Sequence, residues 1–403
     1  MKVKITPSRL TGTVTAPPSK SFAHRLLIGA AAADGYSVIE NVALSEDMLA
    51  TADCLNALGA EIKLENGKAF VKGFNGKPKA KSELNARESG STLRFLIPVS
   101  LLGGGGKFCG AERLMARGVS LYEEAFKDKG INFCGEKTSL TVTGKIYGGK
   151  FLIPGNVSSQ YITGLLLALP LTERGGEICV LPPVESRDYI NVTLAALKTL
   201  GINVIKKDEN VFTVSGGQTY RAGNYAVEGD WSNAAFLYAL KVMGHDVNVT
   251  GLTENSAQGD KVCKKLLAEI PAGNINFDLA DCPDLAPVLF ATAAAKRGGK
   301  FTGTARLKIK ESDRATAMKE ELEKFGAAAL VRENEVIIEP KDFHPPKETL
   351  SSHNDHRIAM ALAVIASVTG GEIDGAEAVK KSYPNFWDEM KSLGMNIEIL
   401  AEK

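Results

Sequence analysis

The feature that most constrains this fold is a unit that occurs six times along the chain. Each copy has an amphipathic helical stretch, then a glycine or another small residue, then a short strand pattern. In most copies, apolar residues recur three and four positions apart before the glycine and alternate after it, which is typical of a helix, a left-handed cap and a strand. The copies are TADCLNALGAEIKL, LYEEAFKDKGINFC, VTLAALKTLGINVI, VCKKLLAEIPAGNINF, AMKEELEKFGAAALV and FWDEMKSLGMNIEIL.

The spacing of these copies indicates large repeating units. A fourth copy around Gly273 fits less well, whereas the other five predicted helix ends carry a clear glycine: Gly59, Gly130, Gly201, Gly326 and Gly394. Copies in the first half are about 70 residues apart, longer than the roughly 20 to 50 residues of a solenoid repeat. Six βα units of this size divide naturally into two domains of three. The alternative is coincidence, because short Leu-Gly turns after helices are common.

Composition limits the possible partners. The 403 residues suffice for two or three domains, and 48 Lys and Arg against 47 Asp and Glu leave a net charge of +1. Such a chain has no overall attraction to nucleic acid or anionic membranes, so any anion must be held by a local cluster. The six cysteines form no CxxC pair, and no signal peptide or membrane-spanning run is evident. We expect a cytoplasmic protein without nucleic-acid or membrane partners.

Polar and cationic residues precede several apolar helical runs in the first half of the chain. PPSKSFAHRLLIG contains Lys20, Ser21 and Arg25, and ARESGSTLRFLIP contains Gly90. Further candidates follow in AERLMARGVS, NVSSQYITGLLLALP and ESRDYINVTLAAL: Arg113, Arg117, Ser158, Ser159, Gln160, Ser186 and Tyr189. Hydroxyls, amides and guanidinium groups at helix starts can hold phosphate or carboxylate. Taken singly, each segment is equally compatible with a helix cap or a solvated face.

The second half adds carboxylates. Asp284 precedes the apolar run in DCPDLAPVLFATAAA, where it is either a helix cap or a general base. LKIKESDRATAM supplies Lys310, Glu311 and Arg314, and HNDHRIAMALAV and VKKSYPNF supply Arg357 and Lys381. The two histidines at 353 and 356 lack the i, i+4 spacing of metalloprotease ligands, so an anion contact by Arg357 is favoured over a metal. Together the cations exceed what helix capping needs, and a substrate with several negative charges follows.

These segments, taken together, resemble the 5-enolpyruvylshikimate-3-phosphate synthase family. The segments PPSKSFAHR, NVSSQYITGLLLALP, VEGDWSNAAFLYAL, DCPDLAPVLFATAAA, KIKESDR, NDHRIAMALAV and KKSYPNF match its motifs in order, from about Thr11 to Phe386. The resemblance implies an α/β (α+β) fold of two similar domains, each made of three βαβαββ repeats that form an inside-out α/β barrel. A hinge with two chain crossings, near Pro17 and Glu228, would join residues 1–17 and 228–403 to residues 18–227.

The resemblance also implies a reaction. The family transfers the carboxyvinyl group of phosphoenolpyruvate to the 5-hydroxyl of shikimate 3-phosphate by addition and elimination, without a cofactor or metal, and a monomer is expected. The implied catalytic residues are Lys20, Asp284 and Glu311. The implied shikimate 3-phosphate contacts are Lys20, Ser21, Arg25, Ser158, Ser159, Gln160, Ser186, Tyr189, Asp284 and Lys310. The implied phosphoenolpyruvate contacts are Lys20, Gly90, Arg117, Gln160, Arg314, Arg357 and Lys381.

The chain departs from the family pattern beside the implied phosphoenolpyruvate site. The usual GNAGTAMRP reads RESGSTLRF, which places Glu88, Ser91 and Phe95 at unusual positions, and Arg306 stands where an asparagine is frequent. One rival is the sister transferase that acts on UDP-N-acetylglucosamine, whose lysine motif contains asparagine and whose loop carries a cysteine. The other is a non-catalytic anion-binding or RNA-end-processing relative. The SKS run and the joint presence of Lys20, Asp284 and Glu311 favour the 5-enolpyruvylshikimate-3-phosphate synthase family over both rivals.

Overall fold

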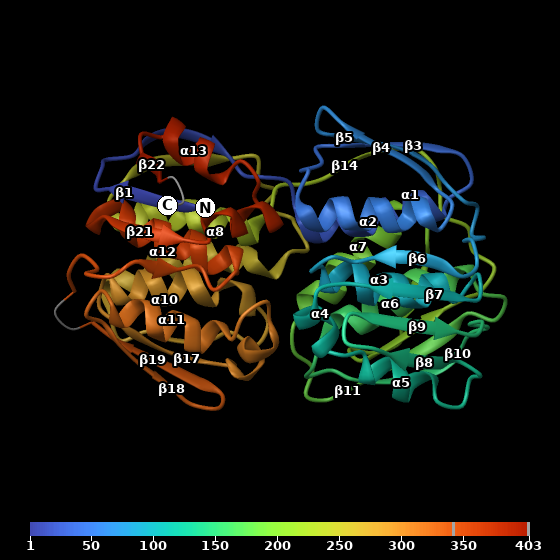
Figure 1. Ribbon diagram of the computed structural model, residues 1–403. Coiled ribbons are helices and arrows are strands. Elements are labelled where there is room, and N and C mark those ends of the chain that lie inside the picture. The colour runs from blue at the N-terminus through green and yellow to red at the C-terminus, as the bar shows by residue number, and fades with distance from the viewer. Residues whose placement is uncertain (341–342, 401–403) are drawn as a thin grey trace. The chain divides into compact units, whose positions relative to one another are not determined.

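Contacts within the chain gather into two compact units (Figure 1). The structure is a computed structural model that describes residues 1–340 and 343–400. The split unit comprises Met1–Ser19 and Glu228–Lys403, and the continuous unit comprises Lys20–Val227. Each unit encloses a hydrophobic core of its own. The chain therefore leaves the split unit after Ser19 and returns to it at Glu228.

Three sheets of one design form the continuous unit, all of whose residues are described. Each sheet has two parallel strands followed by an antiparallel hairpin, in the orders β14-β3-β5-β4, β6-β7-β9-β8 and β10-β11-β13-β12. In the β10–β11 pair, Phe151 lies opposite Ile178 and Ile153 opposite Val180, which places four buried side chains in the core. The strands are β3 (Tyr36–Glu40), β4 (Glu61–Glu65), β5 (Lys68–Lys72), β6 (Ser82–Asn85), β7 (Gly105–Cys109), β8 (Asn132–Gly135), β9 (Ser139–Thr143), β10 (Gly149–Pro154), β11 (Gly176–Leu181), β12 (Val204–Lys206), β13 (Val211–Val214) and β14 (Asn224–Ala226).

Helices of two kinds accompany these sheets. The first helix of each repeat is α1, α3 or α6, and it is almost wholly buried because apolar residues surround it on all sides. The second helix is amphipathic and covers the sheet. The helices are α1 (Lys20–Ala32), α2 (Glu46–Ala57), α3 (Gly90–Ser100), α4 (Glu112–Ala116), α5 (Ser120–Phe126), α6 (Ser159–Ala168) with the 3-10 turn η1 (Leu169–Leu171), and α7 (Arg187–Thr199). The order β6-α3-β7-α5-β8-β9 is one βαβαββ repeat, with the short α4 inserted.

The described residues of the split unit form two sheets of the same design and a shorter one. The orders are β16-β17-β19-β18, β20-β21-β1-β22 and β15-β2. The strands are β1 (Lys2–Thr6), β2 (Thr11–Thr15), β15 (Asp246–Thr250), β16 (Asn276–Asp278), β17 (Gly299–Thr302), β18 (Ala328–Val331), β19 (Glu335–Glu339), β20 (Leu350–Ser351), β21 (Gly371–Asp374) and β22 (Asn396–Leu400). Because β1 comes from the N-terminus and pairs with both β21 and β22, the first residues complete the last repeat.

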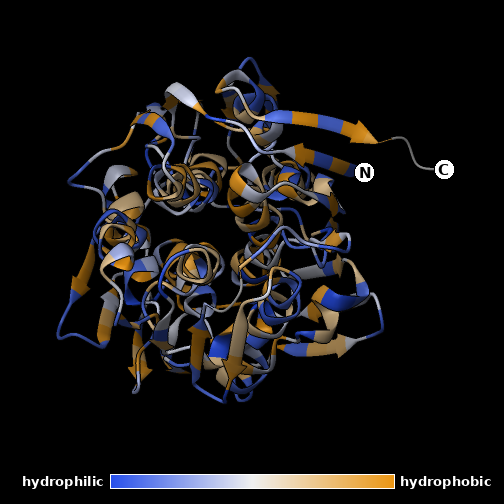
Figure 2. Ribbon diagram, turned by 90° about the vertical axis from the view of Figure 1, so that its left-hand side faces the viewer, coloured by the Kyte–Doolittle hydropathy of each residue, from blue (hydrophilic) through white to orange (hydrophobic). Residues whose placement is uncertain are grey.

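Three buried helices occupy the interior of the split unit. The helices α8, α10 and α12 pack on one another. Figure 2, which views this unit from its own side, shows helices end-on in the interior and strands around the outside. The helices are α8 (Trp231–Met243), α9 (Cys263–Glu269), α10 (Ala286–Ala294), α11 (Arg314–Glu323), α12 (His356–Thr369) and α13 (Phe386–Ser392), with 3-10 turns η2 (Gly259–Val262), η3 (Ile270–Ala272), η4 (Pro283–Leu285), η5 (Ala305–Ile309) and η6 (Ala376–Lys381). The predicted inside-out α/β class is confirmed.

The five clear copies of the sequence unit are confirmed as helix, glycine cap and strand. The glycines predicted to end these helices all adopt positive φ, between 69° and 109°, where a side chain would be strained. In each case the strand that follows is the edge strand of the antiparallel hairpin: β4, β8, β12, β18 and β22. The repeat therefore shows in the sequence because one local turn is built five times.

The fourth copy is only partly confirmed. Its helix is α9, and η3 and Gly273 follow as predicted, but the next strand, β16, pairs parallel with β17 and begins the following sheet. Among the described residues, the β15-β2 sheet has no hairpin. The poor match of this copy thus has a structural reason, because the chain passes directly from α9 into the next repeat. No helix within residues 1–340 and 343–400 is both long and apolar enough to cross a membrane.

Candidate active site

The sequence-predicted residues gather at the starts of helices in both units. In the continuous unit they lie at or beside the N-termini of α1, α3, α6 and α7. In the split unit they lie beside those of α10, α11 and α12. The unpaired amides and the positive dipole end of each helix favour negative charge there. Each unit therefore presents its own cluster, here named the continuous cluster and the split cluster.

Lys20 opens α1 in the continuous cluster. Its Nζ donates to Asp47 Oδ2 at 2.8 Å, and both side chains are largely buried, with 15% and 13% exposed. Asp47 lies in the first turn of α2, which Ser45 caps by accepting from the amide of Met48. Sequence inspection missed Asp47, because it lies 27 positions after Lys20 and no local pattern links the two residues. The carboxylate fixes the position of the ammonium group.

Arg25 lies one turn further along α1 and is 2% exposed. Its guanidinium group donates to the carbonyls of Ser21 and Tyr189 at 2.6 and 3.1 Å, and to the hydroxyls of Thr163 and Thr193 at 3.2 and 2.8 Å. Burial lowers its pKa to about 9, so it remains cationic at neutral pH. Its acceptors are neutral, and the positive charge is therefore not cancelled by them.

Phe95, one of the departures from the family pattern, supports Arg25. The Arg25 guanidinium carbon lies 5.0 Å from the centre of the Phe95 ring, which is a cation–π distance. The same ring contacts His24 edge-on. The Phe95 ring therefore packs against the buried guanidinium group of Arg25.

Gly90, Arg94, Arg117 and Gln160 come together beside the start of α3. A Cβ atom built on Gly90 would lie 2.9 Å from Arg94 Nη1 and 3.3 Å from Arg117 Nη1. Arg94 Nη1 donates to Gln160 Oε1 at 3.0 Å, and Gln160 Nε2 donates to Ser91 Oγ at 3.2 Å. The glycine leaves room beside its backbone for the two guanidinium groups.

Arg94 is a second residue whose part in the continuous cluster the sequence analysis missed. It stands within the apolar run LRFLIP, where a buried arginine is itself a signal. Its Nη2 donates to the Gly118 carbonyl at 3.2 Å, and its guanidinium group stacks 5.3 Å from the centre of the Tyr161 ring. All of these partners are neutral. The cluster thus has a third guanidinium group besides Arg25 and Arg117.

The hydroxyl residues of this cluster stand at two helix starts. Ser158 caps α6 by accepting from the amide of Gln160 at 3.3 Å, and Ser159 is the first residue of that helix. Ser186 precedes α7 with φ of 54° and is 1% exposed, while Tyr189 lies in the first turn. A serine in the left-handed region is strained, and such strain is concentrated at functional sites. Ser158 is thus a helix cap, and the strained Ser186 is a candidate ligand contact.

Asp284 is the centre of the split cluster. Its Oδ1 accepts from Arg314 Nη1 at 2.7 Å and from Lys310 Nζ at 3.2 Å, and its Oδ2 accepts from Arg357 Nη2 at 3.1 Å. The residue lies in η4, and α10 begins two residues later without a side-chain cap. The helix-cap alternative for Asp284 is therefore wrong, and three cations surround this carboxylate instead.

Arg314 holds three carboxylates. Its side chain is 1% exposed, and it donates to Asp284, to Glu311 Oε2 at 2.8 Å and to Asp355 Oδ2 at 2.8 Å. Burial alone would raise the pKa of Asp355, but the adjacent Arg314 holds it below its ordinary value. Arg314 is thus not part of a solvated face, although Asp313 does cap α11 by accepting from the amide of Thr316. Arg314 sets the relative positions of the three acidic groups.

Lys310 and Glu311 extend this network from the turn before α11. Burial lowers the pKa of Lys310, while Asp284 opposes that shift. A lysine with a lowered pKa gives up a proton more readily than an exposed one. The split cluster therefore holds an ammonium group and a carboxylate in direct contact with the same arginine–aspartate core.

Arg357 and Lys381 meet at the start of α12. Arg357 Nη1 donates to the Asp284 carbonyl at 3.2 Å, and Asp355 caps the helix by accepting from the Arg357 amide at 2.9 Å. Lys381 Nζ donates to the Asn354 carbonyl at 2.6 Å. His353 and Asn354, which precede the cap, both have positive φ. This strained loop brings Lys381 from η6 to the helix that carries Arg357.

Asp260 is a third residue that sequence inspection missed. It lies in η2 and is 5% exposed. Burial raises its pKa to about 7, and the negative charge of Asp284 adds to this effect. Its signal, a lone acid in QGDKV, was not distinctive.

Among residues 1–340 and 343–400, no group of three or more His, Cys, Asp or Glu side chains is placed to hold a metal ion.

Solved structures place this fold among the enolpyruvyl transferases. EPSP synthase from Acinetobacter baumannii superposes with a TM-score of 0.79 at 26% identity, covering 98% of this chain and 99% of that one. The enolpyruvyl transferase NikO from Streptomyces tendae has the same TM-score at 15% identity, covering 98% of each chain, and shares the fold alone.

The family model for EPSP synthase (3-phosphoshikimate 1-carboxyvinyltransferase) matches residues 5–390. Curated 3-phosphoshikimate 1-carboxyvinyltransferases from Clostridium perfringens and Clostridium kluyveri are each 38% identical over 98% of this chain and 98% of their own. The chain belongs to the EPSP synthase family. It is accordingly an enolpyruvyl transferase of the shikimate pathway, and both rival readings of the sequence are set aside.

Proposed function

We propose that the chain transfers the carboxyvinyl group of phosphoenolpyruvate to the 5-hydroxyl of shikimate 3-phosphate and releases phosphate. The observation that carries this proposal is the split cluster, where Arg314 holds Asp284, Glu311 and Asp355 together in a member of this family. Addition requires a proton on the methylene carbon of phosphoenolpyruvate and loss of one from the attacking hydroxyl. Elimination then removes a proton and phosphate from the adduct. Acids and bases held in fixed geometry supply these transfers.

Asp284 is the proposed base toward the hydroxyl. Its carboxylate is bound by Lys310, Arg314 and Arg357. A phosphate or carboxylate of the substrate competes for the guanidinium group of Arg357, because bidentate anion binding is what this group favours. Loss of that cation to the substrate leaves Asp284 Oδ2 able to accept the proton of the hydroxyl. Anion binding and proton removal are thereby coupled at one residue.

Glu311 and Lys20 are the proposed groups for the methylene proton. Glu311 is held by Arg314 at 2.8 Å and is 27% exposed, so it keeps access to a ligand. Lys20 is held by Asp47, which orients the ammonium group. Lys310, in contact with Asp284, is proposed to orient shikimate 3-phosphate. These roles follow the family pattern, and the contacts support them chemically.

The continuous cluster is proposed to recognise shikimate 3-phosphate. Ser21, Ser158, Ser159, Ser186 and Tyr189 offer hydroxyls at or near the starts of α1, α6 and α7. Lys20 and Arg25 supply positive charge, and Arg25 also orders the backbone at Ser21 and Tyr189. A polyhydroxylated ring with a phosphate needs both kinds of group.

Phosphoenolpyruvate is proposed to contact Lys20, Gly90, Arg117 and Gln160 from one cluster, and Arg314, Arg357 and Lys381 from the other. The described contacts support this assignment within each unit. Gly90, Arg117 and Gln160 gather around Arg94, and Arg314 and Arg357 share Asp284. Arg94 joins the proposed set because it binds Gln160 directly. The described partners of Arg314 are all carboxylates. Its proposed contribution is therefore mainly to position these groups.

Phosphate release tests the reaction. Purified chain is mixed with phosphoenolpyruvate and shikimate 3-phosphate, together and singly, and inorganic phosphate is measured over time. Release is expected only with both substrates. Release with UDP-N-acetylglucosamine in place of shikimate 3-phosphate, or with phosphoenolpyruvate alone, would contradict the proposal.

We further propose that the chain works as a monomer in the cytoplasm. All six cysteines lie in the described residues, and none of them forms a disulfide bond. A reduced state is typical of the cytosol. Sedimentation at micromolar concentration is expected to give a single species of about 43 kDa, and a heavier species would contradict the monomer.

A further inference from the structure

A cavity of about 490 Å³ opens in the continuous unit at the ends of the helices away from the proposed active site. Ala32 ends α1, and Leu102 and Leu171 lie where α3 and η1 end. Lys20 and Ala32 are the first and last residues of α1, whose 13 residues span about 20 Å. The cavity is therefore distinct from the continuous cluster.

The cavity wall repeats the threefold design of the unit. The loops after β5, β9 and β13 each close on the end of the first helix of their own repeat. The amides of Gly76, Ile146 and Gln218 donate to the carbonyls of Ala32, Leu101 and Pro170 at 2.9, 3.0 and 2.9 Å. These bonds fix the wall without any ligand contact, so the space is preformed. Its volume lies within the roughly 300 to 1,000 Å³ typical of small-molecule sites.

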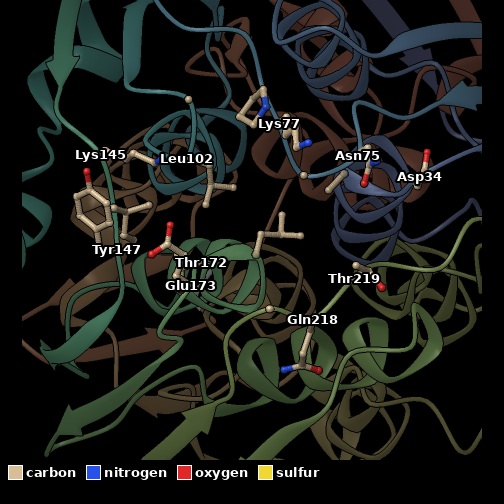
Figure 3. A pocket seen from close by; sticks show the side chains of 17 residues that line it. Asp34, Asn75, Lys77, Leu102, Lys145, Tyr147, Thr172, Glu173, Gln218 and Thr219 are labelled. Carbon is tan, nitrogen blue, oxygen red and sulfur yellow. The ribbon is translucent and has the colours of Figure 1, made fainter.

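The chemistry of the lining is amphiphilic. Leu102, Ile146 and Leu171 supply an apolar surface. Figure 3 shows Lys145 and Glu173 on one side of this surface, Asp34 on the other, and Lys77 between them at the top of the view. Two acids and two bases thus surround an apolar centre.

These four charged side chains do not pair with one another. Within the described residues, Asp34, Lys77, Lys145 and Glu173 make no ion pair and no side-chain hydrogen bond, and the one contact of Lys145 is with the Tyr147 ring. The C-terminal ends of α1, α3 and η1 also border the cavity, and the negative dipole end of a helix favours a cation nearby. The lysines on the rim favour a carboxylate.

We propose that this cavity binds a small zwitterion with an apolar body, of the class of α-amino acids with aliphatic side chains. The apolar body lies against Leu102, Ile146 and Leu171. The ammonium group faces Asp34 or Glu173, and the carboxylate faces Lys77 or Lys145. The proposal concerns a second site and stands apart from the transferase reaction.

The probe is L-leucine, compared with 3-methylbutylamine, which lacks the carboxylate, and 4-methylpentanoate, which lacks the ammonium group. Methyl resonances of Leu102, Ile146 and Leu171 in the full chain are followed by NMR during titration. Leucine is expected to shift these resonances saturably, and each truncated compound to bind about tenfold more weakly. Equal binding of all three compounds, stronger binding of either truncated one, or unshifted methyls at about 50 mM leucine would overturn the proposal.

Charge variants locate the two ends of the ligand. The double substitution Lys77→Ala and Lys145→Ala is expected to weaken leucine and 4-methylpentanoate about tenfold and to leave 3-methylbutylamine unchanged. The matched control, Lys107→Ala with Lys127→Ala, removes two exposed lysines of the same unit outside the cavity and should change nothing. Equal weakening in both double variants would also overturn the proposal. The titration uses neither proposed substrate, so its failure leaves the proposed reaction untouched.

Discussion

The buried arginines of the two units differ in the groups to which they donate. In the continuous unit, Arg25 and Arg94 donate to carbonyls, hydroxyls and an amide, and both rest on aromatic rings. In the split unit, Arg314 and Arg357 donate to carboxylates. Neutral acceptors leave positive charge for a ligand, whereas carboxylate acceptors create a poised set of acids and bases. The comparison indicates that one unit mainly holds anions and the other mainly moves protons.

The largest expected effect comes from Arg314→Met. This change leaves Asp355, which is 0% exposed, without its main cation, and breaking a buried pair in this way costs about 3–5 kcal/mol of unfolding free energy. Turnover should fall at least about a thousandfold because three carboxylates lose their common partner. Denaturant unfolding and phosphate release measure the two effects.

Arg332→Met is the matched control, because Arg332 is 60% exposed and pairs only at the surface of the same unit. It should leave both measurements within error of the unchanged chain. If Arg314→Met were as stable and as active as that control, the split cluster would not depend on its central arginine.

A smaller effect is expected in the continuous unit from Gly90→Ala. The new methyl group would lie 2.9 Å from Arg94 Nη1, so this guanidinium group, which donates to Gln160, must shift. We expect KM for phosphoenolpyruvate to rise about tenfold, equivalent to about 1.4 kcal/mol, with a smaller change in kcat. Steady-state kinetics check this, with Gly135→Ala as control because no atom lies within 4 Å of its Cβ. An unchanged KM would show that the guanidinium pair does not need the glycine.

Sequence reasoning reached the features that depend on neighbouring residues. Glycine caps such as Gly59 and Gly201 are local, and they revealed the repeat. The fourth copy misled because its helix and Gly273 are local, whereas the partner of β16 is chosen by the tertiary fold. No local pattern distinguishes a strand of a hairpin from the first strand of the next sheet.

The candidate site could be predicted from the sequence to the same extent as the fold. Lys20, Asp284 and Arg314 stand in motifs that can be recognised one by one. Asp47, Arg94 and Asp260 act through partners far away in sequence, such as the 66 residues that separate Arg94 from Gln160. The sequence also could not distinguish a capping carboxylate from one surrounded by cations, and only the contacts of Asp284 decided that question.

Each unit also contains a buried histidine with a lowered pKa. Burial is the main cause for both His24 and His245. Because the pKa of each is lower in the fold than in the unfolded chain, the unfolded chain takes up protons first as pH falls below about 6.5. Stability then decreases by at most about 1.4 kcal/mol per pH unit for each histidine. Unfolding at pH 7.5 and 5.5, repeated with His24→Gln and His245→Gln, should show a shallower slope in each variant. Equal slopes in all three chains would rule out these histidines as the titrating groups.

The smallest expected difference concerns the sheets. Among the described residues, β15 pairs only with β2, whereas β17 in the same unit is paired on both sides. Backbone amides on the free edge of β15 should therefore exchange with deuterium faster than those of β17. Hydrogen exchange followed by NMR checks this, and equal protection of the two strands would indicate that the edge of β15 is covered.

The division of roles is tested most directly by Asp284→Asn, with turnover and the dissociation constant for shikimate 3-phosphate measured on one preparation. Asp281→Asn, an exposed acid three residues earlier, is the control. Phosphate release should fall by at least about a hundredfold, the contribution typical of a general base. Shikimate 3-phosphate should bind within about threefold of the unchanged chain, a difference below roughly 0.7 kcal/mol. Unchanged turnover, or loss of shikimate 3-phosphate binding in step with turnover, would contradict the account.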